Sequence, residues 1–189
     1  MIRIAVLGDI GSGKSYVAKN FGYPVFNADI EVDKLYKNKK IIFNKLKKIL
    51  PKYIYSFPID KNEISEAILT NKLNLRKIVR IIHPEIRKKM NFFLKKNNKK
   101  KFLRLDIPLL LKNKINNKDD ILVFVDAEKK QIFKRLKKRK NFNLKLFKKF
   151  KKIQLPLEYK KKKSKFIINN NFTYKSVKKS VKFILGEIL

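Results

Sequence analysis

The sequence predicts an α/β protein in which a parallel sheet is covered by helices on both of its faces. Segments typical of strands and helices alternate along the chain, and the expected strands are short, nearly continuous apolar runs. That combination is typical of parallel strands buried on both sides. Since 44% of the 189 residues are apolar, the chain is long enough for one domain with a core of its own.

The first half of the chain begins with a strand and continues mainly as helix. Residues Ile2–Leu7 form an apolar strand, Lys14–Phe21 is expected to be a helix, and Pro24–Ala28 is a second short strand. A long helical stretch follows, interrupted mainly at Pro51–Asp60. We expect Pro84 to begin a further helix, because proline is well placed in a first turn.

The second half returns to strands and helices after a polar connection, Lys95–Lys101. Strands are expected at Phe102–Ile107, Ile121–Asp126 and Lys165–Ile168. Helices are expected at Glu128–Lys138 and Leu144–Tyr159, with a possible break of the second helix at Pro156. The final helix has apolar residues on one face at helical spacing. These are Val177, Val181, Ile184, Leu185 and Ile188.

The charge of the chain is strongly positive, with 50 basic against 15 acidic residues and a net charge of +35. A nucleic-acid-binding protein would explain this, and so would the codon bias of an AT-rich genome. Lysine is spread along the whole chain, asparagine, isoleucine and phenylalanine abound, and tryptophan is absent. We therefore favour codon bias and expect no specific nucleic-acid partner. A positive surface would still attract polyanionic metabolites such as nucleotides.

The compartment is predicted from what the sequence lacks. No run of 18 apolar residues occurs, the N-terminal apolar segment is too short for a signal peptide, and there is no cysteine. We expect a cytoplasmic protein with no membrane partner and no disulfide or thiolate site.

The segment "GDIGSGKS" (residues 8–15) fits the phosphate-binding pattern G-x-x-x-x-G-K-[ST]. It follows a strand and precedes a helix, which is the context that the pattern requires. Its glycines allow amide N–H groups to close around phosphate oxygens, Lys14 reaches the β- and γ-phosphates, and Ser15 is a ligand for Mg²⁺. We expect ATP and Mg²⁺ as cofactors. The nucleotide-binding candidates in and beside this loop are Gly8, Gly11, Ser12, Gly13, Lys14, Ser15 and Tyr16.

The loop motif does not specify a reaction, because switch GTPases, ATPases and small-molecule kinases share it. The guanine-recognition pattern N-K-x-D occurs once, as "NKDD" at residues 117–120, immediately before the strand expected at Ile121–Asp126, so this short pattern does not decide between a GTPase and a kinase. The chain has a single histidine in its helical region, and residues 134–152 are rich in lysine and arginine. We expect this basic segment to fold over phosphates as a lid.

Across nearly its whole length, the sequence resembles the dephospho-CoA kinase family. The loop "GDIGSGKS" is joined by "FNAD" (26–29), similar to the family's D-A-D segment, and by "IIHPEI" (81–86), similar to its H-P motif. "LDIPLLL" (105–111) resembles D-x-P-L-L-F-E, and "VFVDAEKKQIFKRLKKR" (123–139) resembles the strand and Q-x-x-R-x-x-x-R helix before the lid. "QLPLEYKKKKSKFIINN" (154–170) resembles the closing Q…K…A-D-x-V-I-x-N segment.

This resemblance implies phosphoryl transfer from ATP to the ribose 3′-hydroxyl of dephospho-CoA, the last step of coenzyme A biosynthesis (EC 2.7.1.24). It makes Asp29 the base toward that hydroxyl, and His83, Pro108 and Leu109 substrate contacts. Position supports Asp29 independently, because it follows the second strand and is therefore expected beside the phosphate loop. The alternatives are a helix N-cap for Asp29 and a half-buried structural or capping role for His83.

Four further residues are assigned to the transferring nucleotide. Asp106 ends a strand that faces the loop and is expected near Mg²⁺, with a strand-end cap as its alternative. Arg135 and Arg139 lie one helical turn apart and are expected to clamp phosphates, Arg135 in a catalytic role, with a solvated helix face as the alternative. Asn170 is expected to contact the nucleotide.

The sequence departs from the family pattern at several positions. Tyr16 stands where threonine is usual, Asn27 replaces the first aspartate of D-A-D, Lys112 replaces a glutamate, and Ser164-Lys165 replaces the late A-D pair. Because Lys14, Ser15 and Asp29 remain, we expect the chemistry to be retained. Lys112 and Lys165 each stand where the family has an acid, so ion pairs built on those two acids are expected to be absent.

We therefore predict a single P-loop NTPase-type kinase domain, residues 1–189, with a helical acceptor-binding region at about 30–98 and the lid at 134–152. It is expected to act as a monomer or weak homo-oligomer. Two alternatives stay open: another small-molecule or nucleotide kinase on the same fold, and a basic, nucleotide-dependent RNA-binding protein.

Overall fold

A computed structural model describes residues 1–107, 110–111, 115–139 and 142–188. It divides into two compact units. Unit 1 comprises Met1–Asn27, Asn97–Asn143 and Phe150–Leu189, and unit 2 comprises Ala28–Lys96 and Leu144–Lys149. Unit 1 contains the sheet, and unit 2 is helical.

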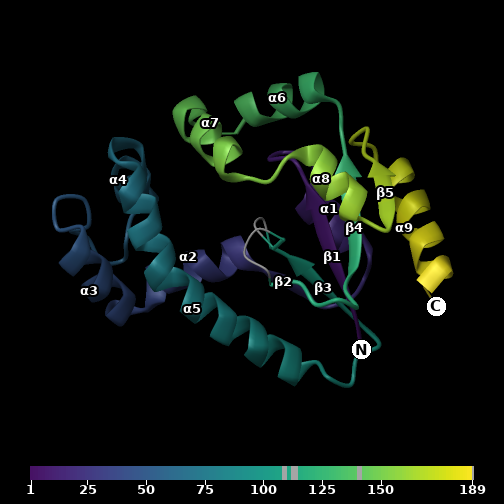
Figure 1. Cartoon of the computed structure of the whole chain (residues 1–189), viewed down its shortest axis with the longest axis horizontal. Helices are drawn as coiled ribbons and strands as arrows, with labels where there is room; N and C mark the ends of the chain where they lie inside the picture. Colours follow the sequence, from purple (N-terminus) through teal and green to yellow (C-terminus); the bar gives the residue numbers. More distant parts are fainter. Residues whose placement is uncertain (108–109, 112–114, 140–141, 189) are drawn as a thin grey trace. The chain divides into compact units, whose positions relative to one another are not determined.

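Unit 1 is built on a five-stranded sheet of order β2-β3-β1-β4-β5 (Figure 1). The strands are β1 (Ile2–Gly8), β2 (Val25–Asn27), β3 (Phe102–Asp106), β4 (Ile121–Asp126) and β5 (Phe166–Asn169). All neighbouring strands pair in parallel. The predicted α/β class with a parallel sheet is confirmed. In this order β1 is the central strand, so the phosphate-binding motif that follows it emerges from the middle of the sheet.

The apolar runs form strands because both of their faces are covered. Every residue of β3 is buried, and so are the last five residues of β1. One face of the sheet packs on α1 (Lys14–Asn20) and α9 (Tyr174–Ile188), and the apolar stripe predicted for the last helix lies there. The core of this face consists of Ile4, Val6, Val17, Ala18, Phe21, Phe102, Val123, Val125, Ile168, Val177, Val181 and Ile184.

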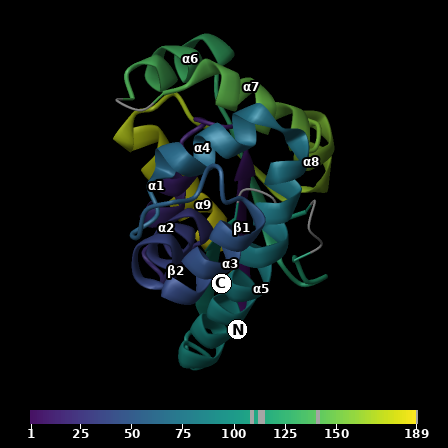
Figure 2. The same ribbon diagram turned by 90° about the vertical axis from the view of Figure 1, so that its left-hand side faces the viewer.

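The opposite face of the sheet carries α8 (Leu157–Lys163), which contacts β1 and β4 (Figures 1 and 2). The helix expected at Leu144–Tyr159 is therefore two helices, α7 (Leu144–Ile153) and α8. Pro156 is the N-cap residue of α8. Its fixed φ and missing N–H suit the beginning of a helix and disfavour its middle, so the break that Pro156 suggested is real.

Unit 2 contains α2 (Ala28–Asn38), α3 (Lys40–Ile49), α4 (Lys61–Thr70), α5 (Lys72–Lys96) and the first part of α7. The ammonium of Lys149 donates hydrogen bonds to the carbonyl oxygens of Ile68 and Leu69, in the last turn of α4. These carbonyls have no partner within the helix, and a lysine is a favourable cap for them.

Pro84 does not begin a helix, contrary to our expectation, but lies inside α5. A proline there removes one backbone hydrogen bond and costs about 3 kcal/mol. Ile78, Ile82, Ile86 and Met90 are buried on one face of α5, on both sides of the proline. Burying such a side chain contributes roughly 1.5–3 kcal/mol, so the stripe as a whole outweighs the proline and the helix continues.

None of the helices in the described part of the chain is both long and apolar enough to span a membrane.

Candidate active site

The phosphate-binding motif forms a tight loop between β1 and α1. Gly8 ends the strand, the N–H of Ser12 bonds to the carbonyl of Asp9 at 3.2 Å, and α1 begins at Lys14. The Lys14 ammonium lies 2.7 Å from the same Asp9 carbonyl oxygen. Ser12 is fully buried, whereas Ser15 and Tyr16 are exposed. The loop therefore presents Lys14 and Ser15 together at the end of the central strand.

Two glycines of this loop are required by close contacts. A Cβ atom on Gly8 would lie 2.6 Å from the carbonyl oxygen of Val125 and 2.7 Å from Ser12 Oγ. Gly13 has φ +90°, and a Cβ atom there would lie 2.4 Å from Asn170 Nδ2. A side chain at either position would displace the backbone. The third candidate, Gly11, faces Leu136 on α6 (Lys129–Lys137).

Asn170 braces the phosphate loop from the end of β5. Its side-chain Nδ2 donates to the Ser12 carbonyl at 2.8 Å, and its Oδ1 accepts from the Phe172 N–H at 2.9 Å. Its own N–H bonds to the carbonyl of Asp126 at 2.7 Å. The residue is only 2% exposed. These contacts are with the protein, and the direct nucleotide contact predicted for Asn170 stays a prediction.

The basic residues around the loop are more numerous than the motif alone predicts. The Asp9 carboxylate is buried, accepts from the N–H of Ile10 at 2.8 Å, and forms an ion pair with Lys151 Nζ at 3.2 Å. Lys160 is buried as well, and its ammonium lies 3.4 Å from the Gly8 carbonyl oxygen. Three ammonium groups, including that of Lys14, therefore converge on Gly8 and Asp9. This excess of positive charge suits the binding of a polyphosphate.

A carboxylate lies where β2 and β3 end side by side. Asn27 and Asp106 are register partners, and Asn27 Nδ2 donates to Asp106 Oδ2 at 2.8 Å. Asp106 is only 4% exposed, at the carboxyl edge of the strand next to β1. Asn27, where the family has an aspartate, therefore orients Asp106 instead of repelling it.

The described residues contain no group of three or more acidic, histidine or cysteine side chains that is arranged to hold a metal. Magnesium in kinase sites is commonly bound by one or two protein oxygens together with substrate phosphates. A serine hydroxyl at position 15 and a carboxylate at position 106 fit that pattern.

The two arginines expected to clamp phosphates differ in setting. Arg135 lies in the last turn of α6, and its guanidinium carbon is 4.4 Å from the centre of the Phe172 ring. Arg139 follows α6, which ends at Lys137, and its N–H bonds to the carbonyl of Leu136. The two residues are therefore not on one helix face, because the chain leaves the helix between them. Both side chains are exposed.

Two of the acceptor-side candidates, Asp29 and His83, are in unit 2. Asp29 is exposed and is the second residue of α2. The capping position precedes the helix, so the alternative of a helix N-cap fits Asn27 better than Asp29. His83 is half-buried in α5, and its pKa is lowered, first by burial and then by the charge of Arg87. The remaining substrate candidates, Pro108 and Leu109, lie outside the described residues, as does Lys112.

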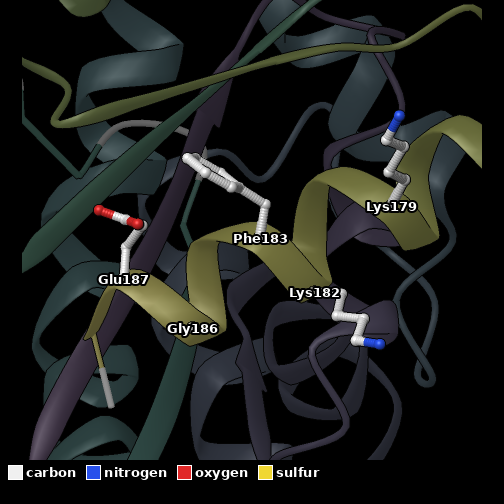
Figure 3. Close-up of a pocket in the computed structure, with 5 residues that line it drawn as sticks. All are labelled: Lys179, Lys182, Phe183, Gly186 and Glu187. Atoms are coloured by element: carbon white, nitrogen blue, oxygen red, sulfur yellow. The ribbon is translucent and has the colours of Figure 1, made fainter.

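A shallow surface depression of about 520 Å³ lies along the second half of α9 (Figure 3). Lys179, Lys182, Phe183, Gly186 and Glu187 line it. None of them belongs to the phosphate loop or to the residues that contact it, so this depression is not the nucleotide site.

Sequence reasoning missed Asp9, Lys151, Lys160 and Phe172. Asp9 occupies a variable position of the motif, and the two lysines are part of a chain rich in lysine. For Lys160 a signal existed, since it is the lysine of the Q…K segment that resembles the family. Phe172 has φ +63°, which a phenylalanine rarely adopts and which no sequence pattern revealed.

The family model for dephospho-CoA kinase matches residues 2–176. The dephospho-CoA kinase of Wolbachia pipientis wMel is 34% identical over 190 residues, covering 98% of this chain and 97% of the relative. That of Rickettsia bellii is 30% identical, covering 100% of this chain and 98% of the relative.

Solved structures of similar fold include TT1252 from Thermus thermophilus, with a TM-score of 0.78 at 23% identity, covering 100% of this chain and 98% of that one. Dephospho-CoA kinase from Campylobacter jejuni matches with a TM-score of 0.64 at 23% identity, covering 98% of this chain and 96% of that one. Shikimate kinase from Bacteroides thetaiotaomicron matches with a TM-score of 0.52 at 13% identity, covering 99% and 98%. The fold is thus that of the P-loop kinases, and the family match over residues 2–176 is more specific: the chain belongs to the dephospho-CoA kinase family (EC 2.7.1.24), the ATP-dependent kinases that complete coenzyme A biosynthesis.

Proposed function

We propose that this chain transfers the γ-phosphoryl group of ATP to the ribose 3′-hydroxyl of dephospho-CoA, giving CoA and ADP. The observation that carries this proposal is the braced phosphate loop, with Lys14 at its end, in a chain that matches the family over residues 2–176.

The phosphate loop is the site for the donor, ATP. Its backbone N–H groups and the Lys14 ammonium bind the β- and γ-phosphates, with Gly8, Gly11, Ser12 and Gly13 shaping the loop and Tyr16 beside it. Phosphoryl transfer is catalysed mainly by positioning and by stabilising charge on the transferring group. Lys14 therefore acts in catalysis as well as in binding.

Ser15 and Asp106 would hold Mg²⁺ together with phosphate oxygens of the nucleotide. The ion, when bound, neutralises charge on the β- and γ-phosphates. Asn27 contributes by keeping the Asp106 carboxylate in one orientation.

Asp29 is the base toward the acceptor hydroxyl. It follows the end of β2 by two residues, and β2 ends beside β3 at the carboxyl edge of the sheet. A carboxylate there orients the ribose 3′-hydroxyl for in-line attack and accepts its proton. His83, Pro108 and Leu109 are the further acceptor contacts, and the helical region at about 30–98 is the part of the domain that binds dephospho-CoA.

The basic segment 134–152 acts as the lid. Arg135 and Arg139 close on the transferring phosphates, and Asn170 contacts the nucleotide or acts through the loop that it braces. A stacked guanidinium keeps its charge, so the contact of Arg135 with Phe172 is compatible with a later contact to phosphate. We further propose that the enzyme works in the cytoplasm, as a monomer or weak homo-oligomer without a specific nucleic-acid partner.

The test is ADP release from ATP with a panel of acceptors: dephospho-CoA, pantetheine, shikimate, AMP and dCMP. Phosphorylation of dephospho-CoA alone, at the 3′-hydroxyl, is the expected result. Shikimate is included because a shikimate kinase shares the fold. Turnover with another acceptor and none with dephospho-CoA would replace the proposal by a different kinase activity.

A further inference from the structure

Lys160 is a buried lysine in a run of four consecutive lysines, Lys160–Lys163. It is 4% exposed, whereas Lys162 and Lys163, on the same helix, are exposed. Removing an ammonium group from water is costly unless polar partners compensate for the lost hydration. The partners of Lys160 therefore indicate what it is for.

The ammonium of Lys160 has two oxygen partners and two charged neighbours. It donates to Gln154 Oε1 at 2.6 Å and to the carbonyl oxygen of Gly8 at 3.4 Å. The charged groups that face it are Lys14, which repels it, and Asp9, which attracts it. Lys151, on α7, is paired with that same Asp9 carboxylate. No carboxylate contacts Lys160 directly among the described residues, so its charge is incompletely balanced.

A role in packing alone does not explain this arrangement. An apolar side chain of the same length would fill the space without the cost of burying a charge. The ammonium adds two things that methionine would lack: a hydrogen bond to the first residue of the phosphate loop, and a positive charge beside Lys14. Both the hydrogen bond and the charge stabilise the state in which the loop has bound an anion relative to the state in which it is empty.

We propose that Lys160 is a positioning residue for nucleotide binding, which fixes Gly8 through its carbonyl and adds positive charge behind Lys14, with Gln154 holding the ammonium in place. This role extends the proposed function and depends on one part of it, namely that the loop binds the phosphates of ATP. Lys160 acts through the loop and makes no contact with the transferring phosphate in this role.

The proposal has a consequence for the pH dependence of binding. Burial, followed by the charge of Lys14, lowers the pKa of Lys160 to about 8, and Asp9 only partly opposes this shift. Bound phosphates favour the charged form and raise that pKa again. ATP affinity should therefore fall as the pH rises from 7 to 9, by up to about tenfold, and binding should take up a proton near pH 8.5.

The experiment measures ATP affinity by calorimetry without any acceptor, at pH 7 and pH 9, in buffers of different ionisation enthalpy. The variants are Lys160→Met, which removes the charge, and Lys160→Arg, which keeps it at both pH values. The matched control is Lys162→Met, an exposed lysine on the same helix.

At pH 7 we expect Lys160→Met to weaken binding about tenfold, the effect of one charge-assisted hydrogen bond, and to abolish the proton uptake. Lys160→Arg should restore most of the affinity, and Lys162→Met should behave as wild type.

A second variant keeps the test decisive if Lys160→Met does not fold. Gln154→Glu places a carboxylate next to the ammonium and should move the proton uptake to higher pH. Wild-type affinity and proton uptake in folded Lys160→Met, or an unchanged pH dependence in Gln154→Glu, would overturn the proposal. Since no acceptor is present, a failure of the kinase assignment would appear separately, as ATP binding without phosphorylation of dephospho-CoA.

Discussion

The side-chain amide of Asn170 donates a hydrogen bond to the carbonyl oxygen of Ser12, although the two residues are 158 positions apart in the chain. This bond ties the end of β5 to the phosphate loop after β1. Gly13 allows it, because any side chain at position 13 would collide with the Asn170 amide. The geometry of the nucleotide site therefore depends on the C-terminal part of the chain as well as on the motif.

We predict that Asn170→Ala lowers the free energy of unfolding by about 2 kcal/mol, because it leaves the buried carbonyl of Ser12 and the partly buried N–H of Phe172 without these partners. The dissociation constant for ATP should rise, because the loop loses its brace. Chemical denaturation and ATP titration check both effects. Asn169→Ala, an exposed neighbour, is the control and should change stability by no more than about 0.5 kcal/mol.

Lys14→Ala is expected to abolish measurable phosphoryl transfer in a protein that still folds. The ammonium contacts the Asp9 carbonyl in the loop and is not part of the hydrophobic core, so its loss removes charge from the site and little from the packing. ADP release and circular dichroism, measured on the same preparation, check this. Turnover at the wild-type rate would remove the phosphate loop from catalysis.

Buried Arg104 and half-buried Arg3, both in unit 1, should respond to substitution in opposite directions. Arg104, on β3, is 5% exposed, its Nε and Nη1 have no hydrogen-bond partner among the described residues, and burial lowers its pKa to about 10. Arg3 forms a two-pronged ion pair with Asp120, with both N–O distances at 2.7 Å. Replacing an unpaired buried charge with an apolar residue stabilises a protein, whereas breaking a buried pair destabilises it.

We therefore expect Arg104→Leu to raise the free energy of unfolding by about 1–2 kcal/mol and Arg3→Leu to lower it by about 3 kcal/mol. Urea denaturation of both variants provides the comparison. A destabilised Arg104→Leu protein would show that the guanidinium of Arg104 has a favourable role that its described contacts do not reveal.

The net charge of +35 is expected to give only weak RNA binding. If codon bias is its origin, binding should lack sequence preference and should fade as salt rises to physiological levels, because it consists of scattered phosphate contacts. Fluorescence anisotropy with two unrelated RNA sequences over a salt series measures this. Tight, sequence-selective binding at physiological salt would instead favour the RNA-binding alternative.

The sequence predicted the sheet well because each strand is an apolar run that is buried on both faces. Ile2–Leu7 and Ile121–Asp126 correspond closely to β1 and β4, which lie side by side at the centre of the sheet. Local sequence was a poorer guide where tertiary packing opposed it. Pro84 is the clearest case, because burial of one face of α5 outweighs the local cost of the proline.

Within the site, the sequence predicted the residues of the motif but not the residues that support it. Gly8, Gly13 and Lys14 follow from the pattern, since each is required by phosphate binding. The burial of Lys160 does not follow from its chemistry, because its three lysine neighbours share that chemistry. Its place in the Q…K segment marks the position, and the packing of α8 against the sheet is what buries it. The contact between Arg135 and Phe172 likewise depends on long-range folding.

Asp29→Asn distinguishes a catalytic base from a structural carboxylate. Asparagine keeps the shape and the hydrogen bonding but removes the negative charge and the basicity. Asp29 is exposed and lies within the first turn of α2, so its loss should cost no more than the few tenths of a kcal/mol of a favourable helix-dipole interaction. If Asp29 accepts the proton of the acceptor hydroxyl, kcat should fall by about 10²–10⁴ while ATP affinity and melting temperature change little, because residues 8–15 are untouched. Asp33→Asn, on the same helix, is the control for a general charge effect. Turnover close to wild type in Asp29→Asn would leave Asp29 with a structural role and would require another base for the ribose hydroxyl.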